Sequence, residues 1–223
     1  YIPLWWSSLI VVQAFAIGFF AVYPNGKLNM VQAVVATGIL GALILAILFA
    51  LNAYPGYNKG IPYAVQVRSS FGFRGSKIAT TIRILPAIAW YGIGNWIGAL
   101  AINAITTTLW GFGNVWVYFV LFLILNTIIA IGGIESIKWF DSLAAFVIAV
   151  LLAYTVITVL SARVIPSELL EYPGTWGRPF IATIATTVAA VITGALNISD
   201  ISRHLERRGH LNNWVGHILG ICP

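Results

Sequence analysis

A group of residues suited to binding a ligand, rather than to catalysis, lies inside a long apolar stretch of the sequence. In "LPAIAWYGIGNWIG", Trp90 lies about twelve residues into an apolar run, and Gly94 and Asn95 follow it closely. Tryptophan usually prefers the membrane interfaces, so an indole deep in such a run, beside glycines, can serve as a flat platform for a planar ring. An ordinary tryptophan in the core of a helix bundle explains the same pattern.

A second polar group, Gln13, lies midway along the first apolar run, "SSLIVVQAFAIGFF". An amide in hydrocarbon needs a partner, so Gln13 indicates either a cavity that binds a ligand or a hydrogen bond between helices. Asn103 and Asn126 are similar single amides with weaker signals.

Several chemistries are excluded by missing motifs. The sequence has no GxxxxGK[ST] loop, so no P-loop motor is expected. The spacing of its three histidines matches no metal-binding helix motif, and Glu135, Asp141 and Asp200 lie at the ends of apolar runs rather than inside them. We therefore expect no enzyme activity, no metal and no cofactor.

The elements that position these residues are membrane-spanning helices. The 223 residues are 60% hydrophobic and only 8% charged, whereas a soluble domain carries about 25% charged residues. The apolar runs are long and lack period-2 alternation, which predicts an all-α polytopic protein in the lipid bilayer. The net charge of +6 is read as a topology signal and not as a sign of nucleic-acid binding.

Six apolar runs are long enough to cross a bilayer, and a seventh begins near residue 214. We expect a single membrane domain, 1–223, that is a piece of a longer protein at both ends, because the sequence starts "YIPLWW" and stops inside a new apolar run. The predicted spans are 4–23, 29–53, 78–109, 114–134, 139–162 and 179–199.

The connecting segments predict the orientation. Segments 54–77, 135–138 and 200–213 carry eight Lys or Arg residues, and the opposite side carries three. Since basic loops stay inside, we expect these three segments to be cytoplasmic loops of a plasma-membrane protein. Asp200 and Arg203 lie three residues apart at the inner end of the last full run, where they can pair on one helical face.

Three stretches resemble the nucleobase:cation symporter family, the permeases for cytosine and purines, uracil, thiamine, allantoin and hydantoin. They are "GIPYAVQVRSSFGFRGSKI", "IRILPAIAWYGIGNWIGALAI" and "LNISDISR", and they occur in the family's order. The resemblance implies a leucine-transporter-like fold of two inverted five-helix repeats. This chain then corresponds to the first repeat, the sixth helix and the start of the seventh.

The resemblance also implies roles for individual residues. Trp90 matches the tryptophan that stacks on the substrate ring, but Gly94 stands where members often have Gln, so Asn95, Gln13 or a later helix must supply the polar contact. "TGA" at 193–195 is expected to be the break in the sixth helix, with Gly194 and Asn197 facing the pocket. The backbone carbonyls of Leu9 and Val12 match sodium ligands.

The leading hypothesis is a secondary transporter that imports a heterocycle such as uracil, cytosine, allantoin or hydantoin by alternating access, coupled to Na⁺ or H⁺. In this reading Asp200 and Arg203 hold the inner gate. A passive channel or facilitator and a non-transporting fragment or subunit are the alternatives. The sequence leaves the coupling ion, the particular heterocycle and the oligomeric state open.

Overall fold

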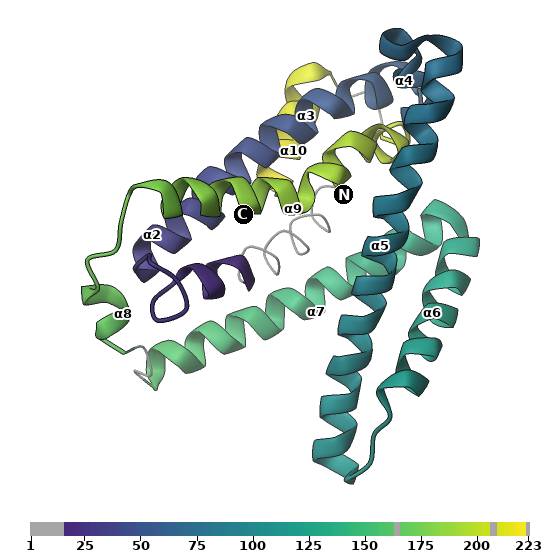
Figure 1. The fold of residues 1–223 in the computed structure, drawn as a ribbon. Coiled ribbons are helices and arrows are strands. Elements are labelled where there is room, and N and C mark those ends of the chain that lie inside the picture. Colours follow the sequence, from purple (N-terminus) through teal and green to yellow (C-terminus); the bar gives the residue numbers. More distant parts are fainter. Residues whose placement is uncertain (1–15, 163–165, 206–208, 222–223) are drawn as a thin grey trace. The chain divides into compact units, whose positions relative to one another are not determined.

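The computed structural model describes residues 16–162, 166–205 and 209–221, and these form helices joined by short connections (Figure 1). Two compact units are present: a discontinuous unit, Tyr1–Gln66 with Ser142–Pro223, and a contiguous unit, Val67–Asp141. The helices are α2 (Met30–Val34), the π-helical segment η1 (Val35–Gly41), α3 (Ala42–Lys59), α4 (Tyr63–Gln66), α5 (Arg68–Trp110), α6 (Val115–Ile131), α7 (Gly133–Ser161), α8 (Glu168–Glu171), α9 (Arg178–Ser202) and α10 (His210–Ile221).

In the discontinuous unit, α2, η1 and α3 follow one another as one helical stretch. A capping box starts it: the Asn29 side chain accepts a hydrogen bond from the backbone of Gln32 at 2.8 Å, and the Gln32 side chain accepts one from the backbone of Asn29 at 3.2 Å. The Gln32 side chain also accepts a hydrogen bond from the backbone N–H of Thr175 at 3.0 Å. This buried amide therefore holds the connection that leads into α9.

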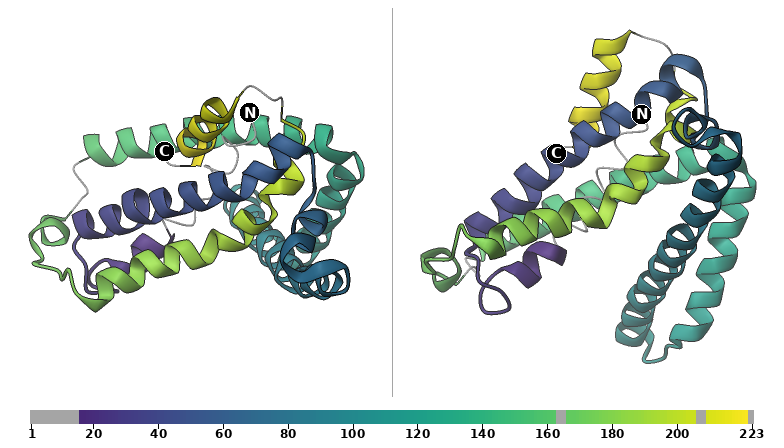
Figure 2. Two further views of the ribbon diagram at one scale, coloured as in Figure 1. Left: turned by 90° about the horizontal axis from the view of Figure 1, so that it is seen from above. Right: turned by 45° about the horizontal axis from the view of Figure 1, so that its top comes forward.

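The core of the discontinuous unit lies between α3 and α9, which run side by side (Figures 1 and 2). Glycines allow the close approach near both ends of α3. A Cβ on Gly41 would lie 2.7 Å from the methyl carbon of Thr187, and a Cβ on Gly56 would overlap the hydroxyl of Ser202. The apolar side chains between these two contacts are fully or almost fully buried: Leu45, Ala46, Phe49, Ala53, Val191, Ala195 and Ile198.

In the contiguous unit, α5 and α6 form a hairpin. Gly111 ends α5 in the left-handed conformation with φ of 72°, and the side chain of Asn114 caps α6 by accepting a hydrogen bond from the backbone of Trp116 at 3.0 Å. Near the start of α5, Gly72 has φ of 66° and ψ of −177°, so the helix bends sharply there. This combination is accessible almost only to glycine.

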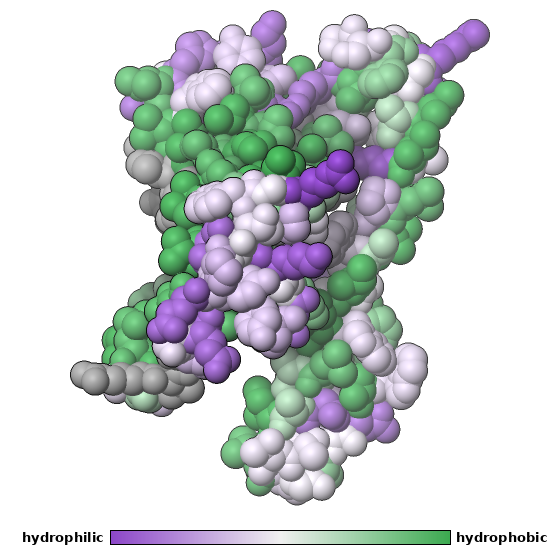
Figure 3. Space-filling model, turned by 60° about the vertical axis from the view of Figure 1, so that its left-hand side comes forward, coloured by the Kyte–Doolittle hydropathy of each residue, from purple (hydrophilic) through white to green (hydrophobic). Residues whose placement is uncertain are grey.

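Four stretches of the described residues are long and apolar enough to cross a membrane: Met30–Lys59, Arg68–Trp110, Gly133–Ser161 and Arg178–Ser202. The shorter apolar helix α6 has 17 residues. Many large apolar side chains are exposed, and Figure 3 shows them in green over much of the visible face. Such surfaces suit lipid rather than water.

Two of the segments predicted as loops, 54–77 and 135–138, are largely helical, so that part of the prediction is wrong. Segment 54–77 contains the end of α3, all of α4 and the start of α5, and 135–138 lies inside α7. Segment 200–213 holds the end of α9 and the start of α10, with non-helical residues 203–205 and 209 between them. The physical reason is that polar, glycine-rich composition is shared by loops and by short helices at a membrane surface.

Candidate substrate-binding site

Trp90 lies on α5 with 40% of its surface exposed. No ring of another described residue contacts its indole. Gly94 is one turn further on the same helical face, and a Cβ added there would meet nothing within 4 Å. Within the contiguous unit, this face of α5 therefore presents an aromatic ring beside open space.

Gly98, unlike Gly94, lies against a neighbouring side chain: a Cβ added there would lie 2.8 Å from the Phe122 ring of α6. Gly94 and Gly98 are four residues apart, a spacing that usually indicates close helix packing. Only Gly98 of this pair packs closely within the contiguous unit.

Asn95 faces α6 and is almost completely buried. Its amide nitrogen donates to the carbonyl of Tyr91 at 2.6 Å, and its amide oxygen accepts from the amide nitrogen of Asn126 at 2.6 Å. The hydroxyl of Tyr91 lies 3.0 Å from the carbonyl of Leu123, to which it donates, and 3.1 Å from the hydroxyl of Thr127. Polar side chains thus connect α5 and α6 along the hairpin: Tyr91 and Asn95 on α5, and Asn126 and Thr127 on α6.

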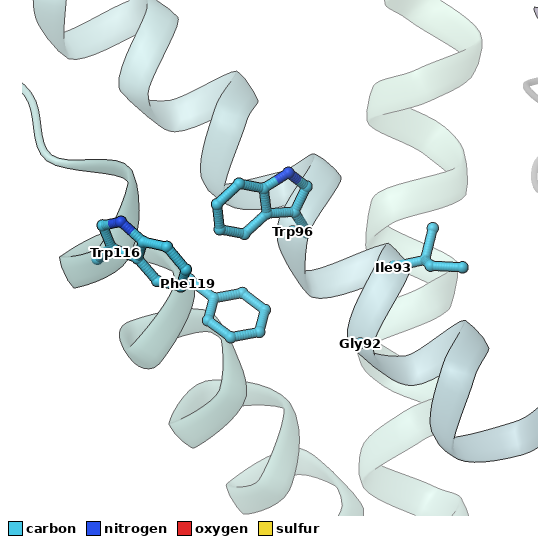
Figure 4. A pocket seen from close by; sticks show the side chains of 5 residues that line it. All are labelled: Gly92, Ile93, Trp96, Trp116 and Phe119. Carbon is cyan, nitrogen blue, oxygen red and sulfur yellow. The ribbon is translucent and has the colours of Figure 1, made fainter. Parts of the chain in front are cut away.

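An apolar pocket of about 410 Å³ lies on the same hairpin (Figure 4). Trp96 makes edge contacts with Trp116 and Phe119, with ring centroids 5.1 and 5.5 Å apart. Gly92 and Ile93 complete the lining of the pocket, and none of its five lining residues is a predicted site residue. The lining is almost entirely apolar and its side chains include no hydrogen-bond acceptor, so we assign these contacts to helix packing.

On α9, the predicted break at Thr193–Ala195 is wrong, because the helix is continuous from Arg178 to Ser202. Val191 and Ala195 are buried against α3, and this packing outweighs the roughly 1 kcal/mol that Gly194 costs a helix. One turn further, the amide oxygen of Asn197 is buried and has no hydrogen-bond partner among the described residues. A buried acceptor without a partner is uncommon in a folded protein.

Asp200 joins α9 to the start of α4. Its carboxylate accepts a hydrogen bond from the backbone N–H of Tyr63 at 2.8 Å, and two residues later the hydroxyl of Ser202 donates to the carbonyl of Ala53 at 2.9 Å. Arg203 donates from Nε to the ring of His204 at 3.2 Å. The predicted pair between Asp200 and Arg203 stays a prediction.

Sequence reasoning missed the contact between Asp200 and Tyr63, although a signal for it was present. Tyr63 belongs to "GIPYAVQVRSSFGFRGSKI" and Asp200 belongs to "LNISDISR", so two of the stretches that carry the family resemblance meet in space. Their separation of 137 residues hides this contact from any local pattern.

The predicted site residues fall into separate groups. Trp90, Gly94 and Asn95 belong to the contiguous unit, whereas Gly194, Asn197, Asp200 and Arg203 belong to the discontinuous unit. Gln13, Leu9 and Val12 lie outside the described residues.

Helices of this length and apolarity define a multi-pass helical membrane protein. A solved structure described as the inward-facing conformation of Mhp1 superposes with a TM-score of 0.71 at 25% identity, covering 99% of this chain and 49% of that one. The predicted leucine-transporter-like fold is thereby confirmed.

The chain belongs to the family of permeases for cytosine/purines, uracil, thiamine and allantoin, whose family model matches residues 1–220. A hydantoin permease of Microbacterium maritypicum is 31% identical over 205 residues, which are 91% of this chain and 41% of that protein. An allantoin permease of Bacillus subtilis is 28% identical over 193 residues, 78% of this chain and 39% of that protein. The chain thus spans about two fifths of the length of these relatives.

Proposed function

We propose that this chain contributes the stacking platform of a secondary active transporter that imports a nucleobase or a related heterocycle, such as hydantoin or allantoin, by alternating access. The observation that carries the proposal is the exposed indole of Trp90 beside the open surface at Gly94. The names of the relatives support a small planar substrate with amide edges.

The polar contacts come from other residues in this proposal. We assign polar contacts with the substrate to Gln13, Gly194 and Asn197, and the amide oxygen of Asn197, which has no partner among the described residues, supports this role because it can accept a hydrogen bond. Asn95 has a structural role in this proposal: its amide oxygen already accepts a hydrogen bond from Asn126, so Asn95 fixes α5 against α6. Discrimination follows from these groups, since a substrate that leaves a buried polar atom unpaired loses about 1–3 kcal/mol.

We further propose that a cation, Na⁺ or H⁺, drives uptake, and that the backbone carbonyls of Leu9 and Val12 are ligands when the ion is sodium. Asp200 acts at the inner gate by holding α9 to the start of α4. The stacking contact at Trp90 contributes about 1–3 kcal/mol, by analogy with bases on aromatic side chains.

The test is uptake of radiolabelled hydantoin, allantoin, uracil and cytosine by the full-length protein in proteoliposomes, with imposed Na⁺ and H⁺ gradients. Trp90→Ala should raise KM about 5- to 150-fold, which is the stacking energy converted to affinity. Trp110→Ala, which changes an exposed tryptophan at the end of α5, serves as the matched control and should leave KM unchanged. An uptake rate that is independent of both gradients would instead indicate a facilitator. An unchanged KM for Trp90→Ala would refute the stacking role of Trp90.

A further inference from the structure

A basic and aromatic surface at the start of α5 has no part in the proposed transport function. The charged side chains of Arg68, Arg74 and Lys77 are exposed. Phe71 and Phe73 are exposed by 60% and 61%. We name these five residues the basic–aromatic patch.

The bend at Gly72 brings the two ends of the patch together. Along a straight helix, Arg68 and Lys77 would be separated by about 13 Å. Across the bend, both reach the same ring: the guanidinium carbon of Arg68 lies 5.1 Å from the centroid of Phe73, and the ammonium nitrogen of Lys77 lies 5.0 Å from it. Each contact alone is an ordinary cation–π interaction.

Two cations on one ring repel each other unless an anion lies near them. Neither Arg68 nor Lys77 forms an ion pair with a carboxylate among the described residues. The contiguous unit has two acidic residues, Glu135 and Asp141. The carboxylate of Glu135 is bound by Lys138 at 2.7 Å, and neither acidic residue forms an ion pair with the patch among the described residues. The contiguous unit therefore gathers positive charge at the patch without supplying a counter-charge there.

We propose that the basic–aromatic patch is a docking site for the headgroup of an anionic phospholipid, bound through its phosphate by Arg68 and Lys77. A lipid fits better than a free anion because Phe71 and Phe73 are exposed beside the charges, and because the apolar run of α5 follows directly. Basic residues at the end of a membrane-spanning helix attract anionic lipids, and aromatic rings prefer the headgroup level.

The test uses the full-length protein in detergent, titrated with phosphatidylglycerol or phosphatidylcholine, with bound lipids counted by native mass spectrometry. Wild type should bind phosphatidylglycerol more tightly. The double variant Arg68→Gln/Lys77→Gln should weaken that binding about 25-fold, at about fivefold for each basic group near an anionic surface. The control Lys27→Gln/Arg178→Gln removes the same charge from two exposed residues elsewhere and should change the affinity by less than threefold.

Two further variants separate the contributions. The charge-preserving swap Arg68→Lys/Lys77→Arg should keep the lipid preference within about threefold of wild type, and Phe73→Leu should weaken it by removing the shared ring. Gel filtration confirms that each variant is folded. Equal affinity for the two lipids, an unchanged preference in Arg68→Gln/Lys77→Gln, or complete competition by inorganic phosphate at the concentration of the lipid would overturn the proposal.

Discussion

Gly56 is the position at which the closest approach of α3 and α9 can be tested by a single methyl group. In Gly56→Ala, the new Cβ would overlap the hydroxyl of Ser202 and lie 2.8 Å from the carbonyl oxygen of Ser199 and 3.0 Å from the backbone nitrogen of Arg203. Two of these three atoms are backbone, so rotation of a side chain cannot relieve the contact. The helices must move apart locally.

The expected change in the free energy of unfolding has three contributions, two that destabilise the fold and one that stabilises it. Overpacking costs about 1–3 kcal/mol, and loss of the hydrogen bond from Ser202 to Ala53 adds about 1 kcal/mol. Alanine favours the helix over glycine by about 0.5–1 kcal/mol. We therefore expect Gly56→Ala to lower the free energy of unfolding by about 1–3 kcal/mol.

The assay is reversible unfolding of the full-length protein by SDS titration in mixed micelles. Gly38→Ala is the matched control, because a Cβ there would meet nothing within 4 Å, and its stability should stay the same or rise slightly. Adding Ser202→Ala to Gly56→Ala should recover only part of the loss, since the contacts with backbone atoms remain. If Gly56→Ala were as stable as Gly38→Ala, the close approach of α3 and α9 would be refuted.

Three further changes test the contiguous unit and the candidate site. Asn126→Leu should lower the free energy of unfolding by about 1–3 kcal/mol in the same assay, because it leaves the buried oxygen of Asn95 without its donor. The double variant Asn95→Leu/Asn126→Leu should recover most of that loss. A double variant that is no more stable than Asn126→Leu would contradict the pairing. Gly72→Ala should cost about 1–3 kcal/mol because of its backbone angles, whereas Gly92→Ala, which has open space around it, should be neutral. Gly94→Gln should lower the uptake KM for amide-edged heterocycles about 2- to 10-fold through one added hydrogen bond, and an unchanged KM would show that the amide does not reach the ring.

The helical fold class was predictable because each spanning helix carries its own signal. A long apolar stretch such as Arg178–Ser202 can form all its backbone hydrogen bonds within itself in lipid only as a helix. The helical parts of segment 54–77 were not predictable in this way. Pro55 lies inside α3 and Gly72 lies inside α5, and both residue types normally indicate loops.

The candidate site was predictable only in part. Trp90 and Gly94 stand out locally, as an aromatic ring and a gap on one helical face. The partner of Asn95 depends on the register of α5 against α6, which a single sequence does not encode in any local pattern. The continuous course of α9 past Gly194 likewise depends on packing against α3, which overrides the preference of glycine.

The division into a contiguous and a discontinuous unit has a consequence for synthesis at the ribosome. The hairpin of α5 and α6 can close as soon as both helices have emerged, because all its contacts are local in sequence. Ala53 and Ser202 are 149 residues apart, which is about 7–30 s of translation. During that interval α9 is not yet available to cover Gly41, at the end of η1, and Gly56 in α3, so this small-residue face is the surface that an insertase or chaperone would have to shield.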